Sequence, residues 1–211
     1  MGKIDPEDIV NTKNDITKAY NSIEARKRLS KFINPSLVSR VIGDGTNRVK
    51  TAGVIEKDLT NSEYGAKYNV PTNTVTINNQ DMLSPQDNLL TQESTLTHEL
   101  SHGFFGNKNK VGMQKFIDTH ISQSKADELN IGGDQDKLMY LTDSEEVRAR
   151  LNQLRQSRDK NNWWKTWTPE DLKNNNHPML EELRQVFDDD KITNMLNTLA
   201  SNSANQFGGL T

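Results

Sequence analysis

Cysteine is absent from the sequence, which excludes disulfide bonds, thiolate metal ligands and a cysteine nucleophile. A metal ion would have to be held by histidine, aspartate or glutamate side chains. The chain offers only four imidazoles for that purpose, so the choice of ligands is narrow. They belong to His98, His102, His120 and His177.

Apolar residues are also scarce. They make up 32% of the 211 residues, and the mean hydropathy is -0.83, whereas an ordinary globular domain is roughly 45–50% apolar with glycine counted. The length suits one domain, with or without an appended helical segment. Part of the chain is therefore expected to be thinly packed, or to become ordered only against a partner.

A surplus of positive charge and long apolar runs are lacking too. With 26 basic and 29 acidic residues the net charge is -3, so a sequence-independent nucleic-acid binder is not expected. No run approaches the ~18 apolar residues of a membrane span, and the polar residues 1–8 lack the apolar core of a signal peptide. We therefore expect neither a nucleic acid nor a membrane as a partner, and a cytoplasmic protein without a signal peptide.

The spacing of apolar residues predicts an α+β protein. Helices are expected over 14–33, 36–42, 92–105, 110–124, 143–157, 179–187 and 191–200, a strand over 48–56 and a strand pair over 64–79. Residues 125–137 are polar, and Gly132-Gly133 marks a loop. This pattern corresponds to a small antiparallel or mixed sheet packed on one central helix, followed by a mostly helical C-terminal part. We assign residues 1–157 to the main domain, 158–200 to a helical extension and 201–211 to a flexible tail.

The central helix carries the motif His-Glu-x-x-His at residues 98–102. Four residues make about one helical turn, so His98 and His102 lie on one face and can reach the same ion. Glu99 is offset by about 100° and lies beside the open coordination position, where it can take a proton from a water molecule that zinc has made acidic. The motif therefore predicts a zinc site with Glu99 as general base. The alternative is a surface helix with two solvated histidines.

A catalytic zinc needs a third protein ligand, and position 108, where metzincins place a third histidine, is Lys108. The ligand is therefore expected to be a carboxylate from the helix over 143–157. With the apolar stripe of that helix centred on Val147, Glu146 falls about 100° away, at the edge of the packed face, whereas Glu145 points about 160° away. We predict Glu146 as the ligand, with Glu145 as the alternative. The further alternative is that neither acid binds a metal and that both only complement the positive end of the helix dipole.

Further polar side chains are candidates for the same site. Arg150 lies one turn after Glu146 and is expected to orient its carboxylate. A peptidase must also stabilise an oxyanion with a hydrogen-bond donor. Each side chain considered as that donor could instead have a purely structural role. The donors considered are Tyr140, His120, Tyr64 and Tyr68. Residues 74–78 are predicted either as the edge strand that holds an extended peptide or as a core strand.

Residues 98–102, followed by the acidic helix within residues 140–151, resemble gluzincin-type zincins, whose third zinc ligand is a glutamate. More narrowly, the chain resembles predicted zincin-like metallopeptidases of tailed bacteriophages, including crAss-like phages, and the segments 68–77 and 191–200 are similar to theirs. The resemblance implies a zincin-like fold, a Zn²⁺ cofactor and, by analogy, a place in the virion. It departs from the better-known gluzincins in the 44 residues from His102 to Glu146.

These features predict a hydrolase, a zinc-dependent peptidase whose metal is held by His98, His102 and Glu146 and whose general base is Glu99. Its partners would be a protein or peptide substrate and, from the resemblance, other phage virion proteins, and its location would be the host cytoplasm or the virion. The alternative is a catalytically silent structural or cargo protein of the virion with a zincin fold. The intact Glu99 favours activity, because a purely structural zinc would not require it.

Overall fold

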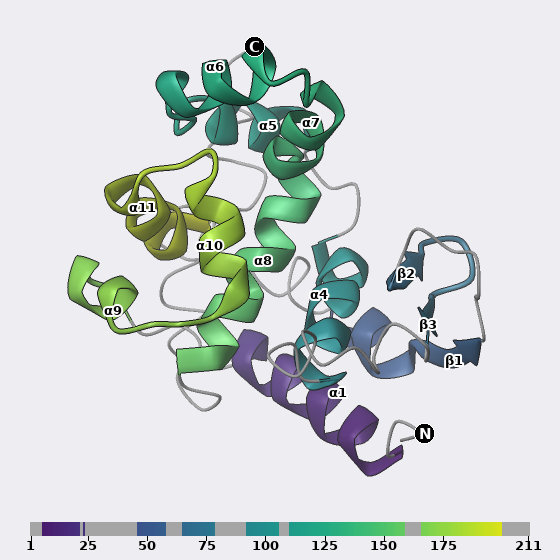
Figure 1. Ribbon diagram of the computed structural model, residues 1–211. Coiled ribbons are helices and arrows are strands. Elements are labelled where there is room, and N and C mark those ends of the chain that lie inside the picture. Colours follow the sequence, from purple (N-terminus) through teal and green to yellow (C-terminus); the bar gives the residue numbers. More distant parts are fainter. Residues whose placement is uncertain are drawn as a thin grey trace.

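The computed structural model describes residues 6–21, 23, 46–57, 65–78, 92–105, 110–158 and 166–199. Within these ranges the protein is α+β, with a small mixed sheet beside a mostly helical body (Figure 1). The strands are β1 (Gly53–Lys57), β2 (Ala66–Asn69) and β3 (Thr74–Asn78). The helices are α1 (Pro6–Asn21), α4 (Gln92–Phe105), α5 (Lys110–Asp118), α6 (Gln123–Ile131), α7 (Gln135–Thr142), α8 (Ser144–Arg158), α9 (Pro169–Lys173), α10 (Pro178–Arg184) and α11 (Asp189–Leu199).

The sheet has the strand order β1-β3-β2, with β3 parallel to β1 and antiparallel to β2. β-Branched residues fit this central position, and Val75 and Ile77 of β3 are fully buried. The strand pair predicted over 64–79 is thus confirmed. The strand predicted over 48–56 is wrong in its first half, because residues 46–51 are helical and β1 begins only at Gly53. So short an apolar pattern does not distinguish a strand from a helical turn.

Strand β2 pairs with β3 on one side, and its other side is an open edge of the sheet among the strands that the structure describes. The Asn78 N–H donates to the Gly65 carbonyl oxygen at 2.8 Å, which makes these two residues a hydrogen-bonded pair. Such pairs alternate with non-hydrogen-bonded pairs in an antiparallel ladder, so the backbone N–H and C=O groups of Ala66 and Tyr68 point toward the open edge. The core-strand reading of residues 74–78 is therefore confirmed, and the edge-strand reading is wrong.

Helix α4 lies between the sheet and α8 and contacts both (Figure 1). Its predicted range of 92–105 is confirmed, and Leu96 and Leu100 are fully buried along its apolar side. Gly103 permits a close approach to β2, because a Cβ atom at this position would lie 2.8 Å from the Tyr68 ring. The missing side chain thus allows the edge strand to pack directly on α4.

Replacing Gly103 with alanine is expected to destabilise the fold by about 1–3 kcal/mol. The Tyr68 side chain cannot easily move away from the added methyl group, because it is buried and its hydroxyl donates a 2.6 Å hydrogen bond to Asn73 Oδ1. Urea denaturation would measure the change, with Gly132→Ala as control, since a Cβ there would meet no atom closer than 3.4 Å. Wild-type stability of Gly103→Ala would contradict this account of the packing.

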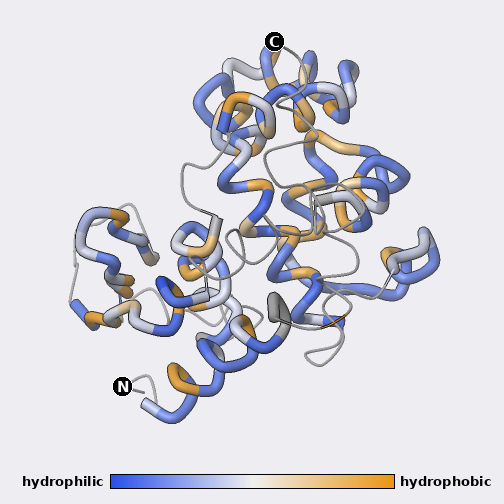
Figure 2. Tube along the Cα trace, turned by 180° about the vertical axis from the view of Figure 1, so that it is seen from behind, coloured by the Kyte–Doolittle hydropathy of each residue, from blue (hydrophilic) through white to orange (hydrophobic). Residues whose placement is uncertain are grey.

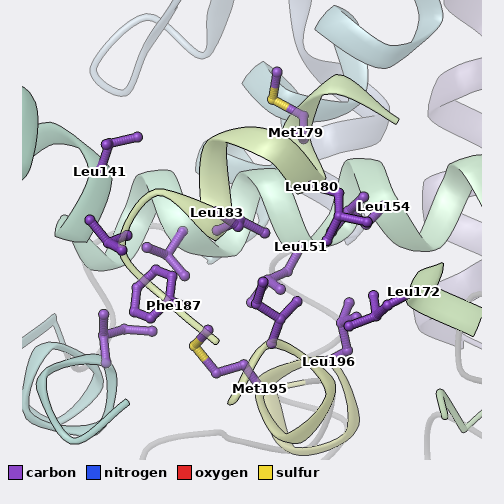
Figure 3. Close-up of a cluster of buried hydrophobic side chains, with 14 of the residues drawn as sticks. Leu141, Leu151, Leu154, Leu172, Met179, Leu180, Leu183, Phe187, Met195 and Leu196 are labelled. Atoms are coloured by element: carbon purple, nitrogen blue, oxygen red, sulfur yellow. The ribbon is translucent and has the colours of Figure 1, made fainter. Parts of the chain in front are cut away.

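The hydrophobic core is built around α8 and the helices that follow it (Figure 3). Leu151 and Leu154 of α8 belong to the same buried cluster as Leu180, Leu183 and Phe187. Figure 2 shows apolar residues spaced among polar ones along the chain, so a helix with such spacing has a narrow apolar stripe to bury. A chain with few apolar residues can therefore still form a large buried cluster. The domain boundary predicted at residue 157 falls at the end of α8, whose core the later helices share.

Several predicted helices are confirmed with shifted ends. The helix over 143–157 is α8, and those over 179–187 and 191–200 correspond to α10 and α11. Near the N-terminus, α1 begins at Pro6 rather than at residue 14. The predictions for 24–42 and 201–211 lie outside the described residues. No helix in the part of the chain that the structure describes is long and apolar enough to cross a membrane.

No helix was predicted over the polar residues 125–137, but α6 covers most of them and α7 begins at Gln135. Only Ala126 of α6 is buried, so this helix has no apolar stripe that periodicity could reveal. The preceding helix, predicted over 110–124, ends at Asp118. The Gly132-Gly133 pair does form the expected turn, with Gly133 at a φ of 77°.

Candidate metal centre

Two imidazoles lie on successive turns of α4. The ring centroids of His98 and His102 are 5.0 Å apart, and the two side chains are 14% and 13% exposed. Glu146 comes from the first turn of α8. That turn is fixed by Asp143, whose Oδ1 accepts hydrogen bonds from the backbone N–H groups of Glu145 and Glu146 at 2.8 and 3.3 Å. The cap therefore determines where the Glu146 side chain leaves the helix.

The Glu146 carboxylate meets both imidazoles. Its Oε2 lies 3.2 Å from His98 Nε2, and its Oε1 lies 3.5 Å from His102 Nε2. Ligand atoms from the three residues all lie within 4.8 Å of one another. Glu146 Oε2 is nevertheless buried and has no hydrogen-bond partner among the described residues, so a bound cation would satisfy this oxygen. The neighbouring Glu145 points to Lys110 instead, at 3.5 Å.

The charges of these groups depend on one another. Burial opposes ionisation of the Glu146 carboxyl, but the imidazoles and the Arg150 guanidinium outweigh it and hold its pKa at about 2. Burial alone would lower the pKa of His98, whereas Glu146 and Glu99 raise it overall. Burial and the charge of His98 lower the pKa of His102 to about 4. The group thus combines a carboxylate that remains ionised with one imidazole, that of His102, that loses its proton readily enough to act as a ligand.

Glu99 is 7% exposed and is the acid next to the first histidine. Burial raises the pKa of its carboxyl to about 7, against the opposing influence of His98 and of a hydrogen bond donated by the Tyr68 backbone N–H. That N–H is one of the groups at the open edge of β2, so the edge strand is connected directly to this acid. A carboxyl with a pKa near neutrality can both accept and return a proton at pH 7.

A pocket of about 250 Å³ opens beside these side chains. Its walls include Ala66 of β2, His98 and Glu99 of α4, Tyr140 of α7, Arg150 of α8 and Glu182 of α10. A larger pocket of about 490 Å³ near residues 174–178 lacks a comparable group of ligands among the described residues. The smaller pocket is therefore the one that joins a candidate metal centre to space for a ligand.

Gln153 contacts the candidate metal centre and was missed by the sequence reasoning. Its Nε2 donates to the Ser94 carbonyl and hydroxyl oxygens, each at 3.1 Å, so its Oε1 faces His98 Nδ1 at 3.0 Å. An amide oxygen only accepts, so Nδ1 carries the proton and Nε2 is left with the lone pair that a metal needs. The signal was present in the sequence, because Gln153 lies seven residues after Glu146, two turns along the same face of α8.

Replacing Gln153 with leucine is expected to weaken zinc binding by about 10- to 100-fold. The imidazole of His98 would lose the acceptor that holds its orientation and its tautomer, while all three ligands remain. Competition with a fluorescent zinc chelator measures the affinity. Gln156→Leu is the matched control, because Gln156 is another buried glutamine of α8 but donates to Glu93, at 2.8 Å. Equal zinc affinities for the two variants would contradict the role assigned to Gln153.

The other predicted site residues do not all lie near the candidate metal centre. Tyr140 lines the pocket, and its ring packs over the Arg150 guanidinium with 4.4 Å from Cζ to the ring centroid. The structure does not bring His120 into this group, because its ring nitrogens lie 2.8 Å from the Phe116 carbonyl oxygen and 3.0 Å from Asn194 Oδ1. The Tyr68 hydroxyl is engaged by Asn73, and position 64 lies outside the described residues.

Comparisons of this chain with protein-family models, with curated proteins and with solved structures find no match.

Proposed function

We propose that this protein is a zinc-dependent peptidase of the zincin type. The observation that carries the proposal is the convergence of His98, His102 and Glu146, in which a buried carboxylate oxygen lacks a hydrogen-bond partner. Two imidazoles and one carboxylate, without a thiolate, are a ligand set used by catalytic zinc sites, which keep one coordination position open. A helix carrying the histidines, an edge strand beside it and a third ligand from a later helix also fit a zincin-like fold with a glutamate ligand.

Zinc held by these three residues would supply Lewis-acid chemistry, polarising a peptide carbonyl and making a water molecule acidic. Glu99 accepts the proton of the attacking water on its carboxylate and later returns it to the leaving amine. Its pKa of about 7 suits both steps at neutral pH. The Tyr140 hydroxyl, at the wall of the pocket, is the proposed donor to the negative charge that develops on the scissile carbonyl oxygen.

The open edge of β2 provides the surface for the substrate backbone. The backbone groups of Ala66 point away from β3, and Ala66 lines the pocket that contains His98 and Glu99. An extended peptide can pair with these groups by strand addition, which holds its main chain independently of sequence. The substrate is therefore an extended or unfolded segment of a protein or peptide.

The test is cleavage of an unfolded protein by the purified chain, combined with measurement of its zinc content. We expect zinc near one equivalent, cleavage that a chelator abolishes, and recovery when zinc is restored. Bound zinc without cleavage of varied substrates would instead support the alternative, a catalytically silent virion protein with a zincin fold. Absence of zinc binding would overturn the peptidase proposal. A place in the virion rests on the phage resemblance alone and would be tested by mass spectrometry of purified particles.

A further inference from the structure

Arg150 is the buried charge of the pocket that the proposed reaction does not use. Its side chain is 1% exposed, and its Nε donates to Glu182 Oε2 at 2.8 Å. Both terminal nitrogens, Nη1 and Nη2, are buried and have no hydrogen-bond partner. A buried guanidinium with unpaired N–H groups is costly, so these groups call for a partner that the described residues do not supply.

The neighbours of Arg150 account for only part of its hydrogen-bonding capacity. Nη2 lies 3.7 Å from Glu146 Oε2, so after a small shift the carboxylate could accept a hydrogen bond from this one nitrogen. The Tyr140 ring covers the face of the guanidinium, whereas the N–H groups lie in its plane and are not satisfied by the ring. Nη1 remains unpaired in either case, and Arg150 lines the pocket.

The charges and the volume of the pocket limit which ligand could pair with Arg150. A guanidinium presents parallel N–H groups that match the two oxygens of a carboxylate. Glu99 and Glu182 line the pocket and Glu146 lies 3.7 Å from Arg150 Nη2, so their negative charge disfavours a dianion such as a phosphate monoester. A volume of about 250 Å³ is below the roughly 300–1,000 Å³ of ordinary ligand pockets, so it suits part of a peptide no larger than a residue or two.

We propose that Arg150 binds a carboxylate of the substrate close to the scissile bond, so that the preferred substrates are peptides that carry a negative charge there. This inference rests on the proposed peptidase function. The carboxylate has two chemical sources, the free C-terminus of a short peptide and the side chain of an aspartate or glutamate. In the first case the protein trims chain ends, and in the second it cleaves beside acidic residues.

A matched peptide series tests the proposal and separates the sources. One peptide ends in a free carboxylate, the second ends in an amide, and the third has the amide end with a glutamine exchanged for glutamate. We expect either the free carboxylate peptide or the glutamate peptide to be cleaved with a kcat/KM about 10- to 100-fold above that of its uncharged counterpart. Arg150→Gln should reduce that ratio to about one, and Arg150→Lys, which keeps the charge without the fork, should leave an intermediate ratio.

The control is Arg184→Gln, because Arg184 pairs with Asp189 and Glu181 rather than with a pocket residue. Its substrate ratio should equal that of the wild type. Cleavage of charged and neutral peptides at equal rates by the wild type would overturn the carboxylate proposal and leave the peptidase function standing. Equal loss of kcat on all peptides in Arg150→Gln, with the ratio unchanged, would overturn it as well, since the guanidinium would then act on the reaction itself.

A binding measurement does not depend on turnover. Calorimetric titration of the metal-free protein with N-acetylglycyl-leucine and with its C-terminal amide should show the acid bound at least about tenfold more tightly, and Arg150→Gln should abolish that difference. If neither this pair nor the corresponding glutamate and glutamine amides differ, the proposal is overturned. A protein that cleaves nothing yet keeps the binding preference would contradict the peptidase function and not the carboxylate site.

Discussion

Replacing Glu99 with glutamine is expected to lower peptide cleavage by about 10²- to 10⁴-fold while the zinc content stays unchanged. Glutamine has nearly the same shape as glutamate but cannot accept the proton of the attacking water. The carboxyl of Glu99 is buried and its pKa is raised to about 7, so an uncharged amide is tolerated at this position without loss of the fold. The cleavage rate is measured on one peptide substrate and the zinc content by elemental analysis, both on the same preparation.

The matched control is Glu93→Gln, which alters another acid of α4 that pairs with Gln156 and does not line the pocket. We expect it to retain both zinc and activity. Wild-type rates in Glu99→Gln would remove the general base from the mechanism. Loss of zinc in the same variant would show that Glu99 acts on the metal centre and not on the proton transfer.

Removing one ligand is expected to abolish the stabilisation of the fold by zinc. Zinc that binds only the native state adds about 4 kcal/mol to the free energy of unfolding when its concentration is about a thousand times the Kd. Thermal denaturation of the wild type should therefore show a rise in Tm with zinc and a fall with a chelator. His98→Ala and Glu146→Ala should show neither change at the same zinc concentration, because two ligands hold zinc far more weakly than three.

The shift produced by zinc, and not the absolute Tm, is the quantity to compare, because Glu146 also contacts His98 and Arg150 without metal. Glu145→Ala is the matched control, since Glu145 lies next to the ligand but contacts Lys110. It should keep the full zinc-induced shift. A shift lost in Glu145→Ala and kept in Glu146→Ala would reverse the assignment of the third ligand.

Helix geometry explains why the residues of the centre could be predicted. The spacing of His98 and His102 places their rings one turn apart in any regular helix, and α4 is regular over this range. The apolar stripe of α8 likewise placed Glu146 nearer the packed face than Glu145, and the structure brings Glu146 to the imidazoles. Each of these predictions depends on residues within a few turns of one helix.

The failures concern contacts between distant elements. Alternation in residues 74–78 indicated a strand but not its place in the sheet, which depends on the pairing of β3 with both neighbours. His120 was a reasonable oxyanion donor by residue type alone, yet it lies in the turn after α5, where its ring contacts Asn194 of α11. Helix α6 was missed because a polar segment can be helical once neighbouring helices support it.

The sequence by itself determined which chemical groups are available and which of them share a helix face: two imidazoles, the acid beside them, and a carboxylate that leads the later helix. Only the tertiary structure decided that α8 lies against α4, that Gln153 and Glu182 complete the surroundings, and that β2 presents the open edge. The reason is physical. Side-chain direction along a helix is a local property of the backbone, whereas the meeting of segments far apart in sequence depends on how the whole chain packs.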